Sequence, residues 1–387
     1  MKISVLTPDL SHNCLGRAYL LAKILQRRYK VEIVGPILGD GIWKPVANHE
    51  DIKYISFGIE GIARNPSKVN DLVNKINGDI IYVSKPLFTS FGVGILSKFK
   101  NHQPLILDID DWQMGLMSGL YQNLSLTQRV KNLIHSARYP HLVASYWNNL
   151  ISEKLTWLSN EITVSNHFLK QKFNGSIVWH ARDTDFFDPE KYNKDSIKDN
   201  FEIPRNKKII MFLGTPRSPK GVEDLVEAVA LLRDQNIVLA VVGLDDDKYS
   251  QSLSKLAQKS LGERFRGFGL QAFEKAPEFL AMSDVVVIPQ RKSPATIGQV
   301  PAKVFDAMAM AKPTIATNVS DLPIILDGCG WIVEPEQPKQ LAKCIQHILN
   351  HPEEAEQVGQ KARKKCIENY SFSAMENVLF DIFKKYE

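Results

Sequence analysis

Cysteines and long apolar runs are scarce in this sequence, and each scarcity excludes a class of protein. Its 387 residues include four cysteines (Cys14, Cys329, Cys344, Cys366) without CxxC spacing, which argues against a disulfide scaffold or a zinc site. No stretch approaches the ~18 uninterrupted apolar residues of a membrane-spanning helix. The apolar start ends at Pro8 and Asp9, too early for a secretory signal. We therefore expect a soluble, cytoplasmic protein.

Dense basic segments are missing as well. The formal net charge is +5, and no Lys/Arg cluster exceeds the pairs at residues 27–28 and 207–208. Dedicated nucleic-acid binders usually carry a more strongly basic patch, so no nucleic-acid partner is predicted. Hydrophobic residues make up 44% and charged residues 24% of the chain. That composition is typical of a globular protein.

The sequence does contain short apolar, β-branched runs that alternate with amphipathic segments. This pattern is typical of parallel sheets flanked by helices. Strands are predicted at residues 3–6, 31–34, 52–56, 80–83, 105–107, 161–164 and 177–179, and again at 209–213, 238–242, 285–288, 314–316 and 331–333. Residues 183–206 between the two sets are polar and proline-containing, which favours a linker. The prediction is an α/β protein with two doubly wound, Rossmann-like domains facing a central cleft, 1–200 and 201–370.

The sharpest local signal lies between a predicted strand and helix at residues 212–221. Gly214, Thr215, Arg217 and Lys220 stand in this turn, where helix N–H groups attract anions and disfavour each cation by roughly 0.3–1 kcal/mol. A bound diphosphate would explain why two cations are placed there. The alternative is a solvated loop whose basic side chains point outward.

A second signal runs from residue 289 to residue 313, where a polar loop enters a nearly all-apolar helix. Lys303 and Asp306 are the only charged residues of that helix, and an unpaired buried carboxylate is costly. One interpretation is an internal Lys303–Asp306 ion pair at i,i+3. The other is that Asp306 accepts hydrogen bonds from ribose hydroxyls while loop amides near Gly298 hold phosphate.

Together the two segments resemble the donor half of retaining glycosyltransferases of the GT-B fold, the large family 4. That family reads Gly-Arg-(x4)-Lys-Gly and later Glu-(x7)-Glu-Ala-Met-Ala-x-Gly-x-Pro, which Lys220-Gly221 and residues 306–313 match well. There are three departures. Thr215 stands where the family has Arg, and Asp306 replaces the second Glu. Gly298 replaces the first Glu, and Gln299-Val300-Pro301 replaces the family's usual Gly-Phe-Gly.

The resemblance implies sugar transfer from a nucleotide-diphosphate sugar to a glycan, lipid-linked or small-molecule acceptor, without metal or another cofactor. Arg217 and Lys220 would neutralise the leaving diphosphate. The second domain would bind the donor and the first the acceptor, with a C-terminal helix at 371–387 packing back on the first domain. The donor-binding residues implied are Gly16, Gly214, Thr215, Thr296, Gly298, Gln299, Lys303 and Asp306.

The first half offers weaker candidates. Asn13 and Gly16 lie in the loop after the first strand, which in the family faces the donor; the alternative is an ordinary helix-entry turn capped by Ser11 or Asn13. Asp108, Asp110 and Asp111 follow a strand, and could contact the acceptor, cap a helix or bind metal. His180 is a structural histidine or a substrate contact.

Residues 112–152 contain no acidic residue but hold basic and aromatic side chains. This composition could form a surface that rests on lipid headgroups at the inner face of a membrane. The alternative is a pair of long helices packed in the first domain. Two rival functions also stay open: a nucleotide-sugar epimerase of the same fold, and a non-catalytic nucleotide-sugar-binding subunit, which the missing first Glu keeps open.

Overall fold

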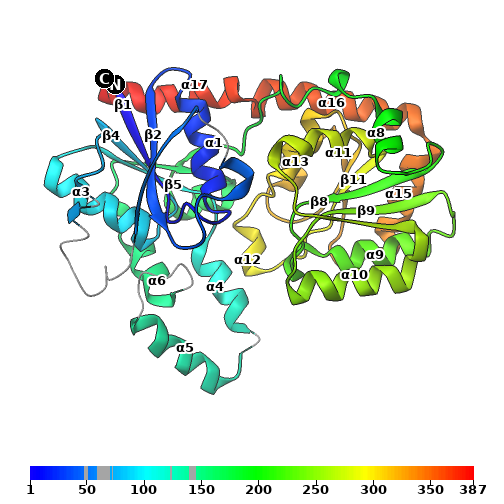
Figure 1. Ribbon diagram of the computed structural model, residues 1–387, viewed down its shortest axis with the longest axis horizontal. Helices are drawn as coiled ribbons and strands as arrows, with labels where there is room; N and C mark the ends of the chain where they lie inside the picture. Colours follow the sequence, from blue (N-terminus) through cyan, green and yellow to red (C-terminus); the bar gives the residue numbers. More distant parts are fainter. Residues whose placement is uncertain (48–50, 59–69, 72, 123, 139–144) are drawn as a thin grey trace. The chain divides into compact units, whose positions relative to one another are not determined.

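The computed structural model describes residues 1–47, 51–58, 70, 71, 73–122, 124–138 and 145–387, and the chain forms two compact units (Figure 1). Unit 1 comprises Met1–His180, Ile297–Gln299 and Met375–Glu387. Unit 2 comprises Ala181–Thr296 and Val300–Ala374. The change of unit after His180 therefore comes before residue 200, where the sequence predicted a boundary.

Within the described residues, unit 1 is built on a seven-stranded parallel sheet in the order β3-β2-β1-β4-β5-β6-β7. The strands are β1 (Lys2–Leu6), β2 (Lys30–Ile37), β3 (Lys53–Gly58), β4 (Ile80–Ser84), β5 (Leu105–Ile109), β6 (Glu161–Val164) and β7 (Ser176–Ile177). The helices are α1 (Leu15–Leu25), α3 (Val93–Asn101), α4 (Gln113–Gln122), α5 (Leu126–Arg138), α6 (Tyr146–Lys154), α7 (His167–Phe173) and most of α17 (Phe372–Phe383).

The core of unit 1 follows from continuously apolar strands. Every residue of β4 and β5 is buried, as expected for a parallel sheet covered by helices on both faces. Helix α17 packs on this unit through Phe383, whose ring centroid lies 5.3 Å from that of Tyr82 and 6.0 Å from that of Tyr29. Lys385 adds an ion pair with Glu161 of β6 at 2.6 Å.

Unit 2 is built on a six-stranded parallel sheet in the order β10-β9-β8-β11-β12-β13. The strands are β8 (Lys208–Leu213), β9 (Ile237–Leu244), β10 (Phe265–Gly269), β11 (Val285–Ile288), β12 (Thr314–Thr317) and β13 (Trp331–Val333). The helices are α8 (Lys194–Asn200), α9 (Val222–Leu231), α10 (Lys248–Leu261), α11 (Ala276–Met282), α12 (Pro294–Ile297), α13 (Lys303–Ala309), α14 (Leu322–Ile325), α15 (Pro338–Asn350) and α16 (Pro352–Tyr370).

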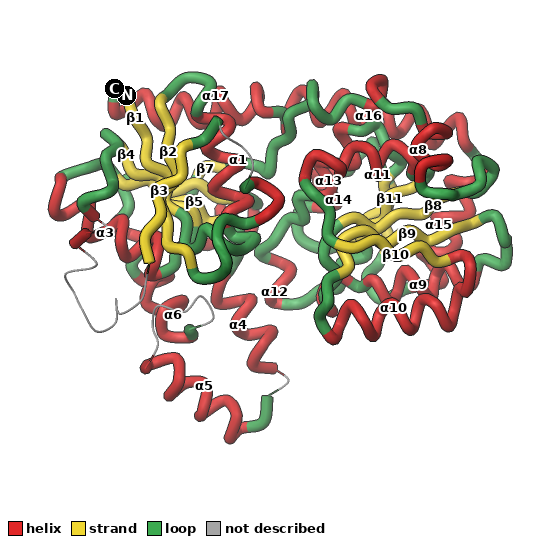
Figure 2. The backbone as a smooth tube through the Cα atoms, in the orientation of Figure 1, coloured by secondary structure: helices red, strands yellow, loops and turns green. Residues whose placement is uncertain are grey.

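Helices cover both faces of the unit 2 sheet. Figures 1 and 2 show α9 and α10 on one face of β8 and β9, and α11 and α13 on the other. The first face buries an apolar cluster that also includes Leu341 and Ile345 of α15. At roughly 25 cal/mol per Å² of apolar surface removed from water, such clusters supply the main driving force for folding.

The predicted doubly wound α/β architecture is confirmed, and every predicted strand is present. Strand β10 was not predicted. Residues 183–206 are not a bare linker, because they contain α8 and bury Ile197 and Ile203 within unit 2. No helix among the described residues combines the length and the apolar character that crossing a membrane requires.

Candidate functional site

The strand order of unit 2 identifies one edge of its sheet as the place for a ligand. Strand numbers fall from β10 to β8 and then jump to β11, so the topology reverses between β8 and β11. In doubly wound sheets, ligands bind beyond the carboxyl ends of the strands at this switch point. The loops that leave β8 after Leu213 and β11 after Ile288 therefore frame the candidate site. These are the two segments that the sequence singled out.

Glycines let the two loops approach each other. Gly214 and Gly221 have φ angles of +122° and +63°, which L side chains rarely adopt. A Cβ on Gly221 would lie 2.1 Å from the Pro289 carbonyl oxygen, so a side chain there would force the loops apart. The backbone N–H of Arg291 also donates to the Pro219 carbonyl at 2.9 Å.

Two lysines gather beside Gly214. Lys220 donates from Nζ to the Thr215 carbonyl at 2.6 Å. The Nζ atom of Lys303 lies 4.1 Å from the centroid of the Phe212 ring, and a Cβ on Gly214 would be 2.7 Å from it. Burial, and then the positive charge of Lys220, hold the pKa of Lys303 well below its ordinary value, against the opposing charge of Asp306. An anion bound here would offset the charge of Lys220 and favour the protonated form of Lys303.

Asp306 is buried in α13, and its ion-pair partner is Arg182. The interpretation that Asp306 pairs with Lys303 was therefore wrong. Arg182 also donates to the carbonyls of Ala181 at 2.7 Å and Ala302 at 3.2 Å. Both charged side chains come from unit 2, and both are less than 10% exposed. The pair fixes the start of α13, the helix that carries Lys303.

The remaining predicted residues of unit 2, Arg217 and Thr296, have partners within that unit. Arg217 is exposed and forms an ion pair with Asp247, whose side chain also caps α10. The Thr296 hydroxyl donates to the Arg291 carbonyl at 2.7 Å and accepts from the Ser293 N–H at 2.9 Å.

Unit 1 has its own switch point, between β1 and β4. Lys85 follows β4 there with a φ of +69°, a conformation that non-glycine residues seldom adopt. Its Nζ atom lies 2.6 Å from Asp110 Oδ1 and 2.6 Å from Asp111 Oδ2, and all three side chains are largely buried. Sequence reasoning missed Lys85. Its only signal is a lysine placed directly after an apolar strand.

The aspartates of this cluster differ in their electrostatics. Asp108 accepts two hydrogen bonds from Arg17, each 2.8 Å long. Burial raises the pKa of Asp110 to about 6, against the opposing charge of Lys85. Burial acts on Asp111 in the same direction, but the charge and hydrogen bond of Lys85 outweigh it and hold its pKa below the ordinary value. Unit 1 thus presents two neighbouring carboxyl groups with opposite shifts, since the pKa of Asp111 is lowered and that of Asp110 is raised.

The other predicted residues of unit 1 lie around this edge of the sheet. Asn13 and Gly16 flank the start of α1, whose N-cap is Cys14 without a side-chain cap, so neither Ser11 nor Asn13 caps the helix. Gly298 and Gln299 group with unit 1, where the Gln299 side chain donates to Asp111 at 2.8 Å. The partly buried His180 is the last residue of this unit's first segment.

Within residues 112–152 the structure has α4, α5 and the start of α6, not the pair of long helices offered as an alternative. Positions 123 and 139–144 lie outside the described residues. Helix α5 exposes much of its apolar side. Leu126, Val130 and Ile134 are 78%, 48% and 67% exposed.

Comparison with known proteins finds a family match in unit 2. Residues 193–365 match the model of the family described as glycosyl transferases group 1. The match covers less than half of the chain and, apart from Ile297–Gln299, falls within unit 2. The matched residues contain the loops that follow β8 and β11, Lys220, Lys303 and Asp306, whereas Arg182 lies before them.

Two curated proteins are similar to parts of this chain. The putative colanic acid biosynthesis glycosyl transferase WcaI of Escherichia coli is 25% identical over 287 residues, which are 70% of this chain and 66% of that protein. The alpha-D-kanosaminyltransferase of Streptomyces kanamyceticus is 28% identical over 184 residues, 46% of this chain and 45% of its own. The chain thus spans about half to two thirds of the relatives' lengths.

Solved structures extend the likeness to the whole fold. Anabaena Alr3699/HepE in complex with UDP and glucose is 16% identical, covers 99% of both chains and has a TM-score of 0.76. The same protein with UDP-glucose has a TM-score of 0.78 at 14% identity and covers 100% of both chains. The predicted resemblance to GT-B glycosyltransferases is confirmed, and the fold is GT-B.

Proposed function

We propose that this chain transfers a sugar from a nucleoside-diphosphate sugar to an acceptor, with retention at the anomeric carbon and without a metal ion. The observation that carries the proposal is the convergence of Lys220 and Lys303 at the switch point of unit 2, beside Gly214. Lysine side chains at this edge can neutralise the charge that grows on a leaving diphosphate, and that charge in turn favours the protonated form of Lys303. The names of the kanosaminyl relative and of the UDP-glucose complex support a nucleotide-sugar donor.

The proposed reaction needs few protein groups. The bond between the anomeric carbon and the donor phosphate oxygen breaks, and the acceptor oxygen bonds to the same face of the sugar. The departing phosphate oxygen takes the acceptor proton. In this scheme Lys220 and Lys303 stabilise the diphosphate, and Arg217 joins them when it leaves Asp247. One carboxylate oxygen of Asp306 stays paired with Arg182, and the other accepts hydrogen bonds from the ribose hydroxyls.

Unit 1 is the proposed acceptor side. In this proposal Asp110 and Asp111 accept hydrogen bonds from hydroxyl groups of the acceptor, and Asn13 and His180 lie at the same edge. The acceptor is a glycan, a lipid-linked sugar or a small molecule. The raised pKa of Asp110 suits a carboxyl that exchanges hydrogen bonds with hydroxyl groups.

A panel of UDP-, ADP-, GDP- and dTDP-sugars tests this function against its rivals. Slow release of the nucleoside diphosphate from one donor, faster with an acceptor extract, is the result expected of a transferase. Conversion of the donor into an isomer would establish an epimerase instead. Binding without turnover would establish a non-catalytic subunit, for which Gly298 at the position of the family's first Glu is the sequence argument.

Metal removal should leave the activity unchanged. We expect turnover in excess EDTA to stay within about twofold of the untreated rate, because amides and cations neutralise the diphosphate in this scheme. The assay is donor turnover before and after chelation. Complete loss of turnover in EDTA, followed by recovery of turnover when Mg²⁺ or Mn²⁺ is added, would contradict the proposal. It would make Asp108, Asp110 and Asp111 metal ligands in place of partners for Arg17 and Lys85.

We further infer that unit 1 rests on an anionic lipid surface through α5. Leu126, Val130, Ile134 and Ala137 recur at helical spacing and are all exposed, so they form one uncovered apolar stripe. At 3.6 residues per turn, Arg129 lies on one flank of the stripe, and Lys131 and Arg138 lie on the other. An apolar stripe between basic flanks is typical of helices that lie in the membrane interface.

Charge complementarity favours lipid headgroups as the occupant of this face. Residues 112–152 contain no Asp or Glu, and each Lys or Arg near an anionic leaflet adds about 1 kcal/mol of binding. Burial of a large apolar side chain contributes about 1.5–3 kcal/mol more. A membrane contact would also bring a lipid-linked acceptor to unit 1.

Vesicle co-sedimentation tests the lipid contact. We expect the chain to bind phosphatidylglycerol vesicles and not phosphatidylcholine vesicles, and Ile134→Asp to weaken that binding at least 10-fold. Phe99→Asp is the matched control, since Phe99 of α3 is 63% exposed in the same unit. Equal binding by both variants would contradict the assignment. A concentration-dependent dimer that Ile134→Asp abolishes would assign the stripe to a second copy of the chain.

A further inference from the structure

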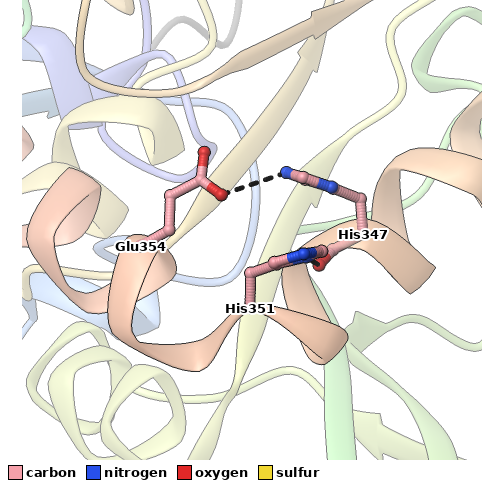
Figure 3. A group of neighbouring side chains, drawn as sticks. All are labelled: His347, His351 and Glu354. Atoms are coloured by element: carbon pink, nitrogen blue, oxygen red, sulfur yellow. Dashed lines mark hydrogen bonds and ion pairs between the residues drawn. The ribbon is translucent and has the colours of Figure 1, made fainter.

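A cluster of potential metal ligands lies at the corner between α15 and α16, in a part of unit 2 that the proposed function does not use. His347 belongs to the last turn of α15, His351 to the junction, and Glu354 to the first turn of α16. Figure 3 shows the three side chains directed toward one another. Their ligand atoms all lie within 4.8 Å of one another, and all three residues are exposed.

A backbone hydrogen bond prepares the imidazole of His351 for a cation. The Nδ1 atom of His351 lies 2.8 Å from the carbonyl oxygen of His347. Because a carbonyl only accepts, Nδ1 carries the proton and Nε2 keeps its lone pair. Histidines that bind metals are usually held in this way, by a backbone carbonyl on the other ring nitrogen.

His347 is the second imidazole of the cluster and also contacts its carboxylate. Its Nε2 atom lies 3.2 Å from a carboxylate oxygen of Glu354, and its ring centroid lies 4.4 Å from that of His351. An exposed ion pair of this kind adds only about 0–1 kcal/mol of stability, so it gives little reason for stacking two imidazoles beside one carboxylate. A shared divalent cation would satisfy both nitrogens and the carboxylate at once.

We propose that His347, His351 and Glu354 bind one Zn²⁺ ion, with water in the fourth position. Two imidazoles and one carboxylate are a ligand set that Zn²⁺ accepts, with bonds of roughly 2.0–2.2 Å. Tetrahedral ligands at that distance lie ~3.4 Å apart. The exposed side chains need only small rotations to reach this spacing. The ion would tie the end of α15 to the start of α16, independently of the donor and acceptor sites.

Titration calorimetry on the full chain, first stripped of metal by dialysis against chelator, tests the site with ZnCl₂ as the probe. The expected result is one ion bound per chain and a higher melting temperature in its presence, because the ligand set exists only in the folded state. His351→Ala should weaken binding by more than the roughly 10- to 100-fold that loss of an outer partner costs.

The neighbouring Glu353 supplies the matched control. Glu353 is exposed in the same first turn of α16 but lies outside the cluster, so Glu353→Gln should bind Zn²⁺ normally while Glu354→Gln binds it more weakly. No Zn²⁺ binding by the unaltered chain would overturn the proposal. So would a bound ion whose affinity is the same in His347→Ala, His351→Ala and the unaltered chain, since the ion would then lie elsewhere.

Discussion

Lys220→Ala should lower the turnover of nucleotide sugar by about 10²–10³-fold, the usual loss when one fixed donor to a developing charge is removed. The size of the expected loss follows from the position of Lys220. Lys220 lies at the switch point of unit 2, where its charge, after burial, helps to depress the pKa of Lys303. With no second cation, the leaving diphosphate would keep more of its charge uncompensated in the transition state. Steady-state kinetics on the best donor of the panel measures the effect.

A control separates this loss from a change in folding or net charge. Lys255→Ala removes an exposed lysine of α10 in the same unit and should leave turnover within about twofold. Both variants should melt at the temperature of the unaltered chain. Turnover of Lys220→Ala within a few-fold of the unaltered chain would remove Lys220 from the site.

Asp306→Asn should lower the free energy of unfolding by about 3–5 kcal/mol, because Arg182 would stay buried without its carboxylate. Chemical denaturation measures this change. If Asp306 also holds the ribose, nucleotide affinity of the folded fraction should fall roughly 10- to 100-fold. A variant of unaltered stability would contradict the buried ion pair.

Two further variants divide the structural from the binding role of Asp306. Arg182→Met with Asp306→Leu removes both charges, and should recover most of the stability that Asp306→Asn loses. It should still bind nucleotide weakly. Asp306→Glu should keep near-normal affinity, because the resembled family carries Glu at this position. Normal nucleotide affinity in the double variant would leave Asp306 with a purely structural role.

Local signals made the sheets and the glycine-framed loop predictable. Strands such as Val285–Ile288 are continuously apolar, and a parallel sheet buries them on both faces. The loop around Gly214 shows its role locally, because glycine and lysines stand directly between a strand and a helix. Strand β10 escaped prediction because Arg266 and two glycines interrupt its apolar pattern.

Pairings between distant segments were not predictable. Arg182 and Asp306 are 124 residues apart, and nothing near either residue indicates the other. The interpretation that Asp306 pairs with Lys303 failed for this reason, since it considered only partners within the same helix. Lys85 follows an ordinary apolar strand, and only the fold brings it to Asp110 and Asp111.

Binding of a diphosphate by the lysines of unit 2 is the step on which the proposed function depends most. Calorimetric titration of the chain with UDP and with uridine tests this binding. If the donor panel selects another base, the diphosphate and the nucleoside of that base take their place. We predict that Lys220→Ala binds the diphosphate about 10- to 100-fold more weakly than the unaltered chain, while both bind the nucleoside equally. Equal diphosphate affinity in the two proteins would contradict the account.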